Sequence, residues 1–416
     1  MLKPINTLKN QRVISIDAFR GITFLIMIIV NELASVSGIS VWLKHMPADA
    51  DAMSFPDIVF PAFLFIVGMS IPFGINHRIA QAQTRWQLNV HIFLRALALI
   101  IMGLFMVNAE SGYHQASMPI SIQAWSLLSY LAFLLIWGVY QFKHVLINRI
   151  LTATGVMLLV VLALIYQGGE NGTQNMTPQW WGILGLIGWA YLISCGIYQL
   201  CRGQQKLLLF SVFICTAFYV LVHSAYFAHF IENNHAIASL LKIIARLDGH
   251  AAHSSIVLLG VICTLIFFEE DSTISHSKSE SKSEPRRFIN AAILFMILIL
   301  AATALRPDFK ISKIYATPSW CFYSAAICIA VFGFLFWLID LRKIQNWMIA
   351  IKPAAINPLV CYLLPFAIEA ILQLGGIQSP LRRFEAGMGI FAALFYSLLI
   401  MFSVHGLNKI NFRIKF

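Results

Sequence analysis

His45 and Asp57 are the two residues whose types and spacing best suit acid–base chemistry. His45 lies on a short loop between two apolar stretches, and Asp57 lies at the start of the second stretch. A neighbouring carboxylate can fix the tautomer of an imidazole and raise its basicity. Without Asp57, an ordinary exposed loop histidine would be the simpler interpretation of His45. The pair therefore predicts a catalytic histidine for proton transfer at this loop.

The apolar stretch before His45 carries polar residues that are costly at bilayer depth and therefore candidates for function. Asp17 and Arg20 are three residues apart and share one helical face. Taken alone, they are better explained as an ion pair at the cytoplasmic interface. Asn31 lies about 16 Å farther along the helix than Arg20, which places it near the His45 loop. It could link helices by hydrogen bonds, or donate one to a developing oxyanion.

Arg95 lies about one turn inside the third apolar run. Its guanidinium could snorkel to the interface, or it could bind a phosphate together with Arg20. His250 and His253 are three apart, but Asp248 is the only carboxylate beside them and no cysteine is near. We therefore predict no metal site. The seven cysteines fall in or beside apolar segments without metal-ligand spacing, which predicts buried thiols.

The composition is that of an integral membrane protein. Hydrophobic residues make up 59% of the chain and charged residues 11%, and the mean hydropathy is +0.78. A soluble domain has about 25% charged residues. The net charge of +11 would suggest nucleic acid in a soluble protein. Here the basic residues lie in short loops, where positive charge sets membrane topology, so nucleic acid is not an expected partner.

The elements that must position these residues are membrane-spanning helices. A span needs about 20 apolar residues, and twelve runs approach this length. The sequence thus predicts an all-α, polytopic membrane helix bundle of eleven or twelve transmembrane helices, forming a single domain over 1–416. The runs are 15–37, 55–75, 90–109, 121–141, 149–167, 180–200, 206–228, 252–268, 288–305, 318–340, 353–374 and 386–406.

Twelve spans would put both termini on one side of the membrane. Lys and Arg are concentrated in the loops of that side, which predicts cytoplasmic termini in a multi-pass inner-membrane protein. His45 and Asp57 would then lie at the opposite face, and Arg20 and Arg95 near the cytoplasm. The Ser/Lys/Glu-rich segment at about 269–287 has no apolar content and predicts a flexible cytoplasmic linker.

Two motifs, beginning at Ser15 and Asp57, with Asn31 and His45 between them, make the start of the chain resemble the heparan-alpha-glucosaminide N-acetyltransferase family. That family has S-x-D-x-F-R-G, an Asn at the end of the span, a loop His, and D-x-V-F-P-x-F-x-F-I-x-G. Its usual Gln-Arg pair in the fourth span is missing here, which leaves the acceptor open. The matching residues are Ser15, Asp17, Phe19, Arg20, Gly21, Asn31, His45, Asp57, Val59, Phe60, Pro61, Phe63, Phe65, Ile66 and Gly68.

The resemblance implies a multi-span acyltransferase that takes acetyl-CoA from the cytoplasm and acetylates a sugar across the membrane. It implies His45 as the catalytic residue, with Asn31 beside it. Together with the residue analysis, it suggests Asp57 as the partner of His45 and Arg20, Arg95 and Asp17 at the CoA site. His45 would be a general base or would itself carry the acetyl group. The expected partners are the lipid bilayer, a glycan or amino-sugar acceptor and a second copy of the chain, within a bacterial inner membrane.

Two other function classes remain open at this point. A secondary transporter or sugar flippase should show repeated, broken helices and an acidic residue at mid-membrane. Glu369 could be such a residue, but no repeat is visible in the sequence. The other class is O-acylation in the manner of the acyltransferase-3 group, which also begins with an Asp- and Arg-containing span and a histidine.

Overall fold

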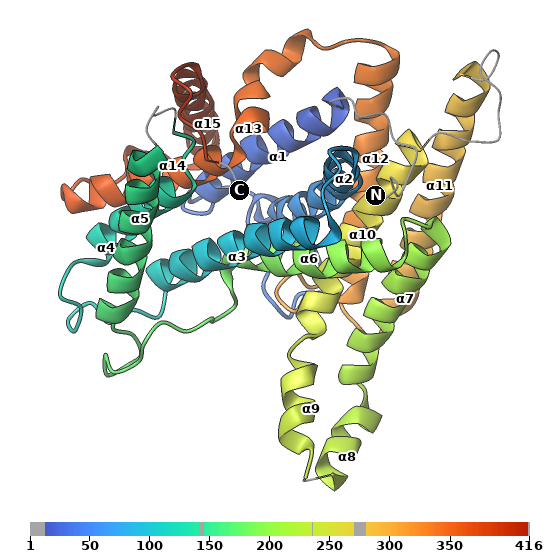
Figure 1. Ribbon diagram of the computed structural model, residues 1–416, viewed down its shortest axis with the longest axis horizontal. Coiled ribbons are helices and arrows are strands. Elements are labelled where there is room, and N and C mark those ends of the chain that lie inside the picture. Colours follow the sequence, from blue (N-terminus) through green and yellow to red (C-terminus); the bar gives the residue numbers. More distant parts are fainter. Residues whose placement is uncertain (1–12, 141–144, 235, 270–279, 415–416) are drawn as a thin grey trace. The chain divides into compact units, whose positions relative to one another are not determined.

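The computed structural model describes residues 13–140, 145–234, 236–269 and 280–414. These residues form helices and connecting loops, and no strand is found among them. Ten of the described helical segments are long and apolar enough to cross a membrane, and two shorter apolar helices accompany them. Each of the twelve apolar runs corresponds to one of these segments. The predicted all-α polytopic bundle is therefore confirmed (Figure 1).

The chain divides into two compact units, and three helices contribute to both. Unit 1 comprises 1–19, 45–96 and 187–345, and unit 2 comprises 20–44, 97–186 and 346–416. The prediction of a single domain stays a prediction. The shared helices are α1 (Ile14–Leu33), α3 (Arg85–Glu110) and α6 (Gly182–Leu200).

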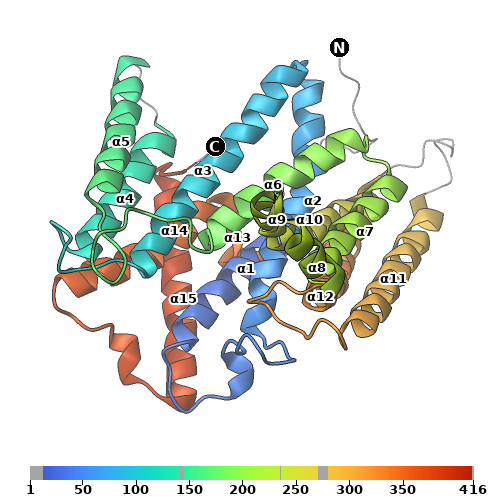
Figure 2. The same cartoon turned by 90° about the horizontal axis from the view of Figure 1, so that it is seen from below.

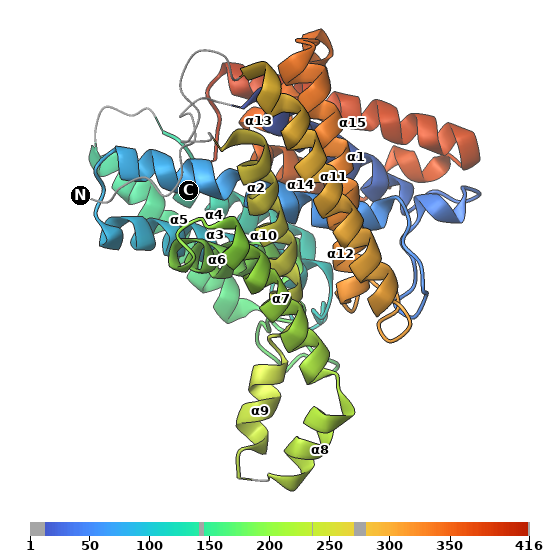
Figure 3. The same ribbon diagram turned by 90° about the vertical axis from the view of Figure 1, so that its right-hand side faces the viewer.

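Unit 1 is built around α2 and α10, which pack against each other along their length. Helices α7, α10, α11 and α12 run side by side, and α8 and α9 project from the ends of α7 and α10 (Figure 3). Its further elements are η2 (Pro56–Ile58), α2 (Val59–Ala80), α7 (Gln205–Val222), α8 (Ala225–Asn233), α9 (Ala238–Ala245), α10 (Asp248–Phe268), α11 (Glu280–Leu305), α12 (Pro318–Phe336) and the π-helical turn Trp337–Leu341.

Two glycines allow α2 and α10 to approach closely. A Cβ atom added at Gly68 would lie 1.9 Å from the carbonyl oxygen of Val257, and one added at Gly260 would lie 2.1 Å from that of Phe65. Small residues at such crossings let helix backbones pack together in membranes, where no hydrophobic force drives helices together. The α2–α10 crossing therefore fixes the helix that begins at Val59, two residues after Asp57.

We expect Gly68→Val to destabilise the protein strongly, because the new side chain would overlap the backbone of α10. Overpacking of a well-packed core typically costs about 1–3 kcal/mol, and a clash with backbone should reach the upper end. Gly74→Val is the matched control, since no atom lies within 4 Å of a Cβ added there on the same helix. Thermal melts in detergent should show a large drop for Gly68→Val alone. Equal melting temperatures for the two variants would contradict the close approach.

Unit 2 pairs α4 with α5 and places α14 against α4 (Figure 2). The indole of Trp125, fully buried on α4, donates to the carbonyl of Leu162 on α5 at 2.9 Å, and the Phe105 ring stacks on it at 5.3 Å. The further elements are η1 (Val41–Leu43), α4 (Ile122–Trp137), α5 (Val145–Ile165), η4 (Asn346–Ala350), α13 (Lys352–Ile356), α14 (Pro358–Leu374), η5 (Pro380–Arg383) and α15 (Ala386–Lys409).

Two further predictions can be compared with these elements. The segment expected to be a linker, about 269–287, is helical from Glu280 onward, because α11 begins there; 270–279 lie outside the described residues. The end of the linker was therefore placed too late. All seven cysteines are free, and all but Cys201 are buried, as their apolar surroundings predicted.

Candidate active site

His45 and Asp57 lie in unit 1 and form a short hydrogen bond. Nδ1 of His45 lies 2.7 Å from Oδ1 of Asp57. Asp57 is 2% exposed, whereas the histidine side chain is 42% exposed. Among the described residues, none makes a hydrogen bond with Nε2 of His45. The predicted pairing is therefore present, with one ring nitrogen on the carboxylate and the other without a hydrogen bond to any described residue.

The local sequence holds the Asp57 carboxylate in place. Pro56 starts the short 3₁₀ turn that leads into α2, and Asp57 follows it directly. Oδ2 accepts hydrogen bonds from the backbone N–H of Met46 at 3.1 Å, from the backbone N–H of Ser54 at 3.1 Å and from the Ser54 hydroxyl at 2.8 Å. These donors favour the ionised carboxylate, which can then accept from Nδ1–H of His45.

Lys313 is a third member of this cluster that the sequence analysis did not identify. Its Nζ lies 3.1 Å from Nδ1 of His45 and 3.8 Å from Oδ1 of Asp57, and its side chain is 24% exposed. Burial lowers the pKa of the Lys313 ammonium, whereas the charge of Asp57 and a hydrogen bond to it act to raise that pKa. Lys313 is 268 residues from His45 in the sequence, so residue spacing gave no signal for it.

Asp51 ties the His45 loop to the loop that carries Lys313. Its carboxylate lies 2.9 Å from Nε of Arg306 and accepts the backbone N–H of Ile311 at 2.9 Å. The Ser312 hydroxyl donates to the carbonyl of Ala48 at 2.6 Å. These contacts bring together segments that are more than 250 residues apart. They explain how Lys313 can reach His45.

The Asp51 contacts predict a pH-dependent stability. The backbone hydrogen bond from Ile311 is the largest cause that lowers the pKa of Asp51, followed by the hydrogen bond and charge of Arg306; partial desolvation acts in the opposite direction. A lowered folded-state pKa contributes stability above the unfolded value of 3.8, and this stability is lost as the pH falls through the folded value. Asp51→Ala should therefore lower the melting temperature at neutral pH, and the difference should shrink below pH 3.8.

Thermal melts across pH check this expectation, with Asp308→Ala as the control. Asp308 is exposed on the neighbouring loop, and its substitution should leave the melting temperature unchanged. A difference between Asp51→Ala and the unaltered protein that is constant from neutral to acidic pH would contradict the electrostatic origin of the effect.

An aromatic layer lies beneath the carboxylate. Nε1 of Trp320, at the start of α12, donates to the backbone carbonyl of Asp57 at 3.3 Å. Phe60 stacks on Trp320 at 6.5 Å, and the ring of His253 meets Phe60 edge-on at 5.2 Å. His253 is buried in this layer. Of the described residues, no three His, Cys, Asp or Glu side chains gather as metal ligands would.

The other predicted site residues lie on α1 and α3. Arg95 belongs to unit 1, and its guanidinium packs over the ring of Tyr191 at 5.1 Å in a cation–π contact. Asp17 belongs to unit 1, whereas Arg20 and Asn31 belong to unit 2. The oxyanion role of Asn31 and the CoA-binding roles of Asp17, Arg20 and Arg95 stay predictions.

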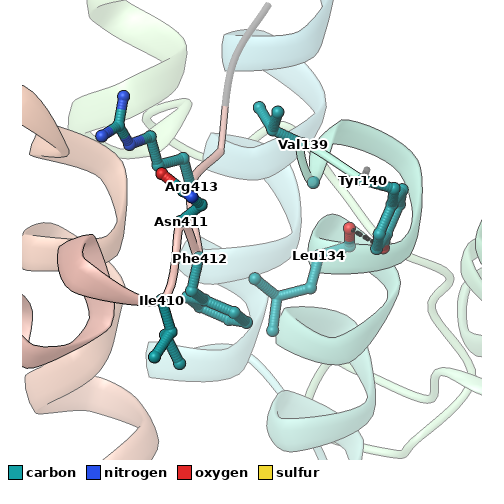
Figure 4. A pocket seen from close by; sticks show the side chains of 8 residues that line it. Leu134, Val139, Tyr140, Ile410, Asn411, Phe412 and Arg413 are labelled. Carbon is teal, nitrogen blue, oxygen red and sulfur yellow. Dashed lines mark hydrogen bonds between the residues drawn. The ribbon is translucent and has the colours of Figure 1, made fainter. Parts of the chain in front are cut away.

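Unit 2 contains a small pocket of about 210 Å³ between the end of α4 and the segment after α15. Figure 4 shows Phe412 beside Leu134, with the Arg413 side chain directed away from Tyr140. Pockets for drug-sized ligands occupy about 300–1,000 Å³, so this one is too small for CoA. None of the predicted site residues lines it. The lining residues are Leu134, Gly138, Val139, Tyr140, Ile410, Asn411, Phe412 and Arg413.

Comparison with known proteins supports the family resemblance in part. Residues 12–207 match the model of a Domain of unknown function, DUF5009. The chain is also 34% identical to human heparan-alpha-glucosaminide N-acetyltransferase over 98 residues, which are 23% of this chain and 14% of the human protein. This is a distant relationship. It suggests an acyltransferase-like function for a multi-pass membrane protein.

Proposed function

We propose that this protein transfers an acetyl group from cytoplasmic acetyl-CoA to an amino or hydroxyl group of a sugar at the opposite membrane face. The observation that carries the proposal is the His45–Asp57 pair, in which Nδ1 faces a buried carboxylate and Nε2 has no partner among the described residues. This arrangement suits a general base. The distant similarity to an N-acetyltransferase supports the choice of acyl transfer over other proton-transfer reactions.

The proposed reaction balances through one proton on His45. Nε2 takes the proton of the acceptor O–H or N–H as the acceptor atom bonds to the acetyl carbonyl carbon. The carbon–sulfur bond then breaks, and the CoA thiolate leaves with the proton that Nε2 carries. Asp57 holds the ring in the correct tautomer and stabilises the transient imidazolium. Asn31 is the proposed donor to the carbonyl oxygen that becomes negative.

His45 could instead carry the acetyl group. Nε2 would attack the thioester carbon and release the CoA thiolate, and the acceptor would then take the acetyl group from the ring and give up its proton, which ends on the thiolate. Both routes need a bare Nε2 and the same Asp57 contact. Kinetics separate them, because only the second route gives a ping-pong pattern and a burst of CoA release before the acceptor is acetylated.

The function is tested with purified protein, labelled acetyl-CoA and a panel of amino sugars and glycans. The proposal expects CoA binding, slow thioester hydrolysis without acceptor and faster acetyl transfer with the right one. Arg20→Gln and Arg95→Gln should weaken CoA binding, because guanidinium groups bind phosphates. A protein that neither binds CoA nor releases it from acetyl-CoA, but moves a sugar into proteoliposomes, would be a transporter and would overturn the proposal.

A further inference from the structure

Nδ1 of His45 has two neighbours that compete for it. Oδ1 of Asp57 lies 2.7 Å from this nitrogen, and Nζ of Lys313 lies 3.1 Å from it. A ring nitrogen either carries a proton and donates, or is bare and accepts. It therefore cannot serve an ammonium donor and a carboxylate acceptor at the same time. The choice between them decides which ring nitrogen is free to act as a base.

The surroundings of Asp57 favour donation from Nδ1 to the carboxylate. A bare Nδ1 would turn its lone pair toward a carboxylate oxygen only 2.7 Å away in a side chain that is 2% exposed. A buried anionic oxygen without a donor is costly. Lys313 does not need the ring as a hydrogen-bond acceptor, because its ammonium also lies 3.8 Å from the anionic Oδ1 of Asp57. Nδ1–H therefore donates to Asp57, and the ammonium lies beside the ring as a charge.

We propose that Lys313 is a positioning residue whose positive charge opposes protonation of the His45 ring. Asp57, in contact with the same nitrogen, favours the protonated ring, so the two charges act in opposite directions on the same group. A charge within about 4–6 Å typically moves a titration midpoint by one unit or more. The balance itself is independent of catalysis. The functional consequence, that His45 is still unprotonated when the acceptor binds, rests on the proposed acetyl transfer.

The other charged groups of the two loops are arranged so that they largely offset one another. Asp51 and Arg306 form their own ion pair at 2.9 Å, and Lys310 interacts with Asp51. Lys44 and Asp49, of opposite charge, belong to the loop that carries His45. Within the described part of the chain, Lys313 and Asp57 are thus the two charged side chains in contact with the ring, and deleting one of them should change its protonation.

The test measures His45 directly and needs neither CoA nor an acceptor. Diethyl pyrocarbonate modifies neutral imidazole, so the modification rate of the His45 peptide against pH, followed by mass spectrometry, reports the protonation of the ring. Lys313→Met should move the midpoint upward by about one pH unit. At a pH below both midpoints, the rate should then fall about tenfold. His229, 76% exposed on α8, is the internal reference in the same digest.

Matched variants separate charge from shape. Lys313→Arg keeps the charge and should restore the midpoint, Lys310→Met on the same loop should leave it unchanged, and Asp57→Asn should move it downward. Lys313→Gln makes the same charge deletion if Lys313→Met fails to fold. An unchanged or lowered midpoint in the folded Lys313 variants would overturn the inference, as would a wild-type His45 that is unmodified at every pH. If the Lys313 variants raise the His45 midpoint but the unaltered protein has no transferase activity, the inference about Lys313 holds and the proposed function is wrong.

Discussion

His45→Ala is expected to lower the rate of acetyl transfer by about 10²–10⁴-fold, which is the usual contribution of a general base. Nε2 of His45 is the basic atom of the cluster that makes no hydrogen bond with a described residue, and the histidine side chain is 42% exposed. CoA binding should change little, because the ring acts on the reacting end of the substrate. Turnover and CoA binding measured on the same preparation therefore distinguish loss of catalysis from loss of binding.

The folding of His45→Ala must be checked as well, because removing the ring takes away the hydrogen bond to Oδ1 of the buried Asp57. His114→Ala is a suitable control, since that histidine lies on an exposed loop and contacts Ser117 rather than the cluster. Both variants should melt cooperatively. A folded His45→Ala protein with a normal transfer rate would remove His45 from the mechanism and leave the cluster with a structural role.

The fold could be predicted from the sequence because the bilayer leaves few alternatives. Backbone polar groups in hydrocarbon must be satisfied within the segment, so long apolar runs can only be helices. All twelve runs are helical for this reason. The linker end was misplaced because its composition is uniformly polar up to Arg287, whereas α11 begins at Glu280, before the apolar part of the helix. Composition indicates where a span must be, but not how far its helix extends.

The site could be predicted only where its residues are close in the sequence. His45 and Asp57 are 12 residues apart, so a loop and the start of the next helix bring them together. Lys313 is 268 residues from His45. It reaches the ring only through the contacts of Asp51 and Ser312 between two loops, and no periodicity indicates such a pairing. The sequence alone therefore could not predict that the Lys313 ammonium lies beside His45 and Asp57.

Asp57→Asn is expected to reduce transfer by up to about 10⁴-fold, the loss seen when the orienting aspartate of a catalytic triad becomes asparagine. The reason lies in the three donors at Oδ2, from Met46 and Ser54. They require an acceptor at that position, so the amide oxygen should occupy it. The amide NH₂ then faces Nδ1 of His45 and donates to it. The ring must carry its proton on Nε2, and the base is lost.

A pH profile distinguishes this tautomer change from simple loss of charge. If Asp57 acted only through its charge, its loss would favour the neutral ring, so Asp57→Asn would still transfer acetyl groups and would do so at lower pH than the unaltered protein. A neutral ring in the wrong tautomer still has no lone pair on Nε2, so the rate should stay low at every pH while the Michaelis constant for acetyl-CoA stays unchanged. Asp49→Asn, exposed on the same loop, should behave as the unaltered protein. A near-normal transfer rate of Asp57→Asn that extends to lower pH would show that the carboxylate acts by its charge alone.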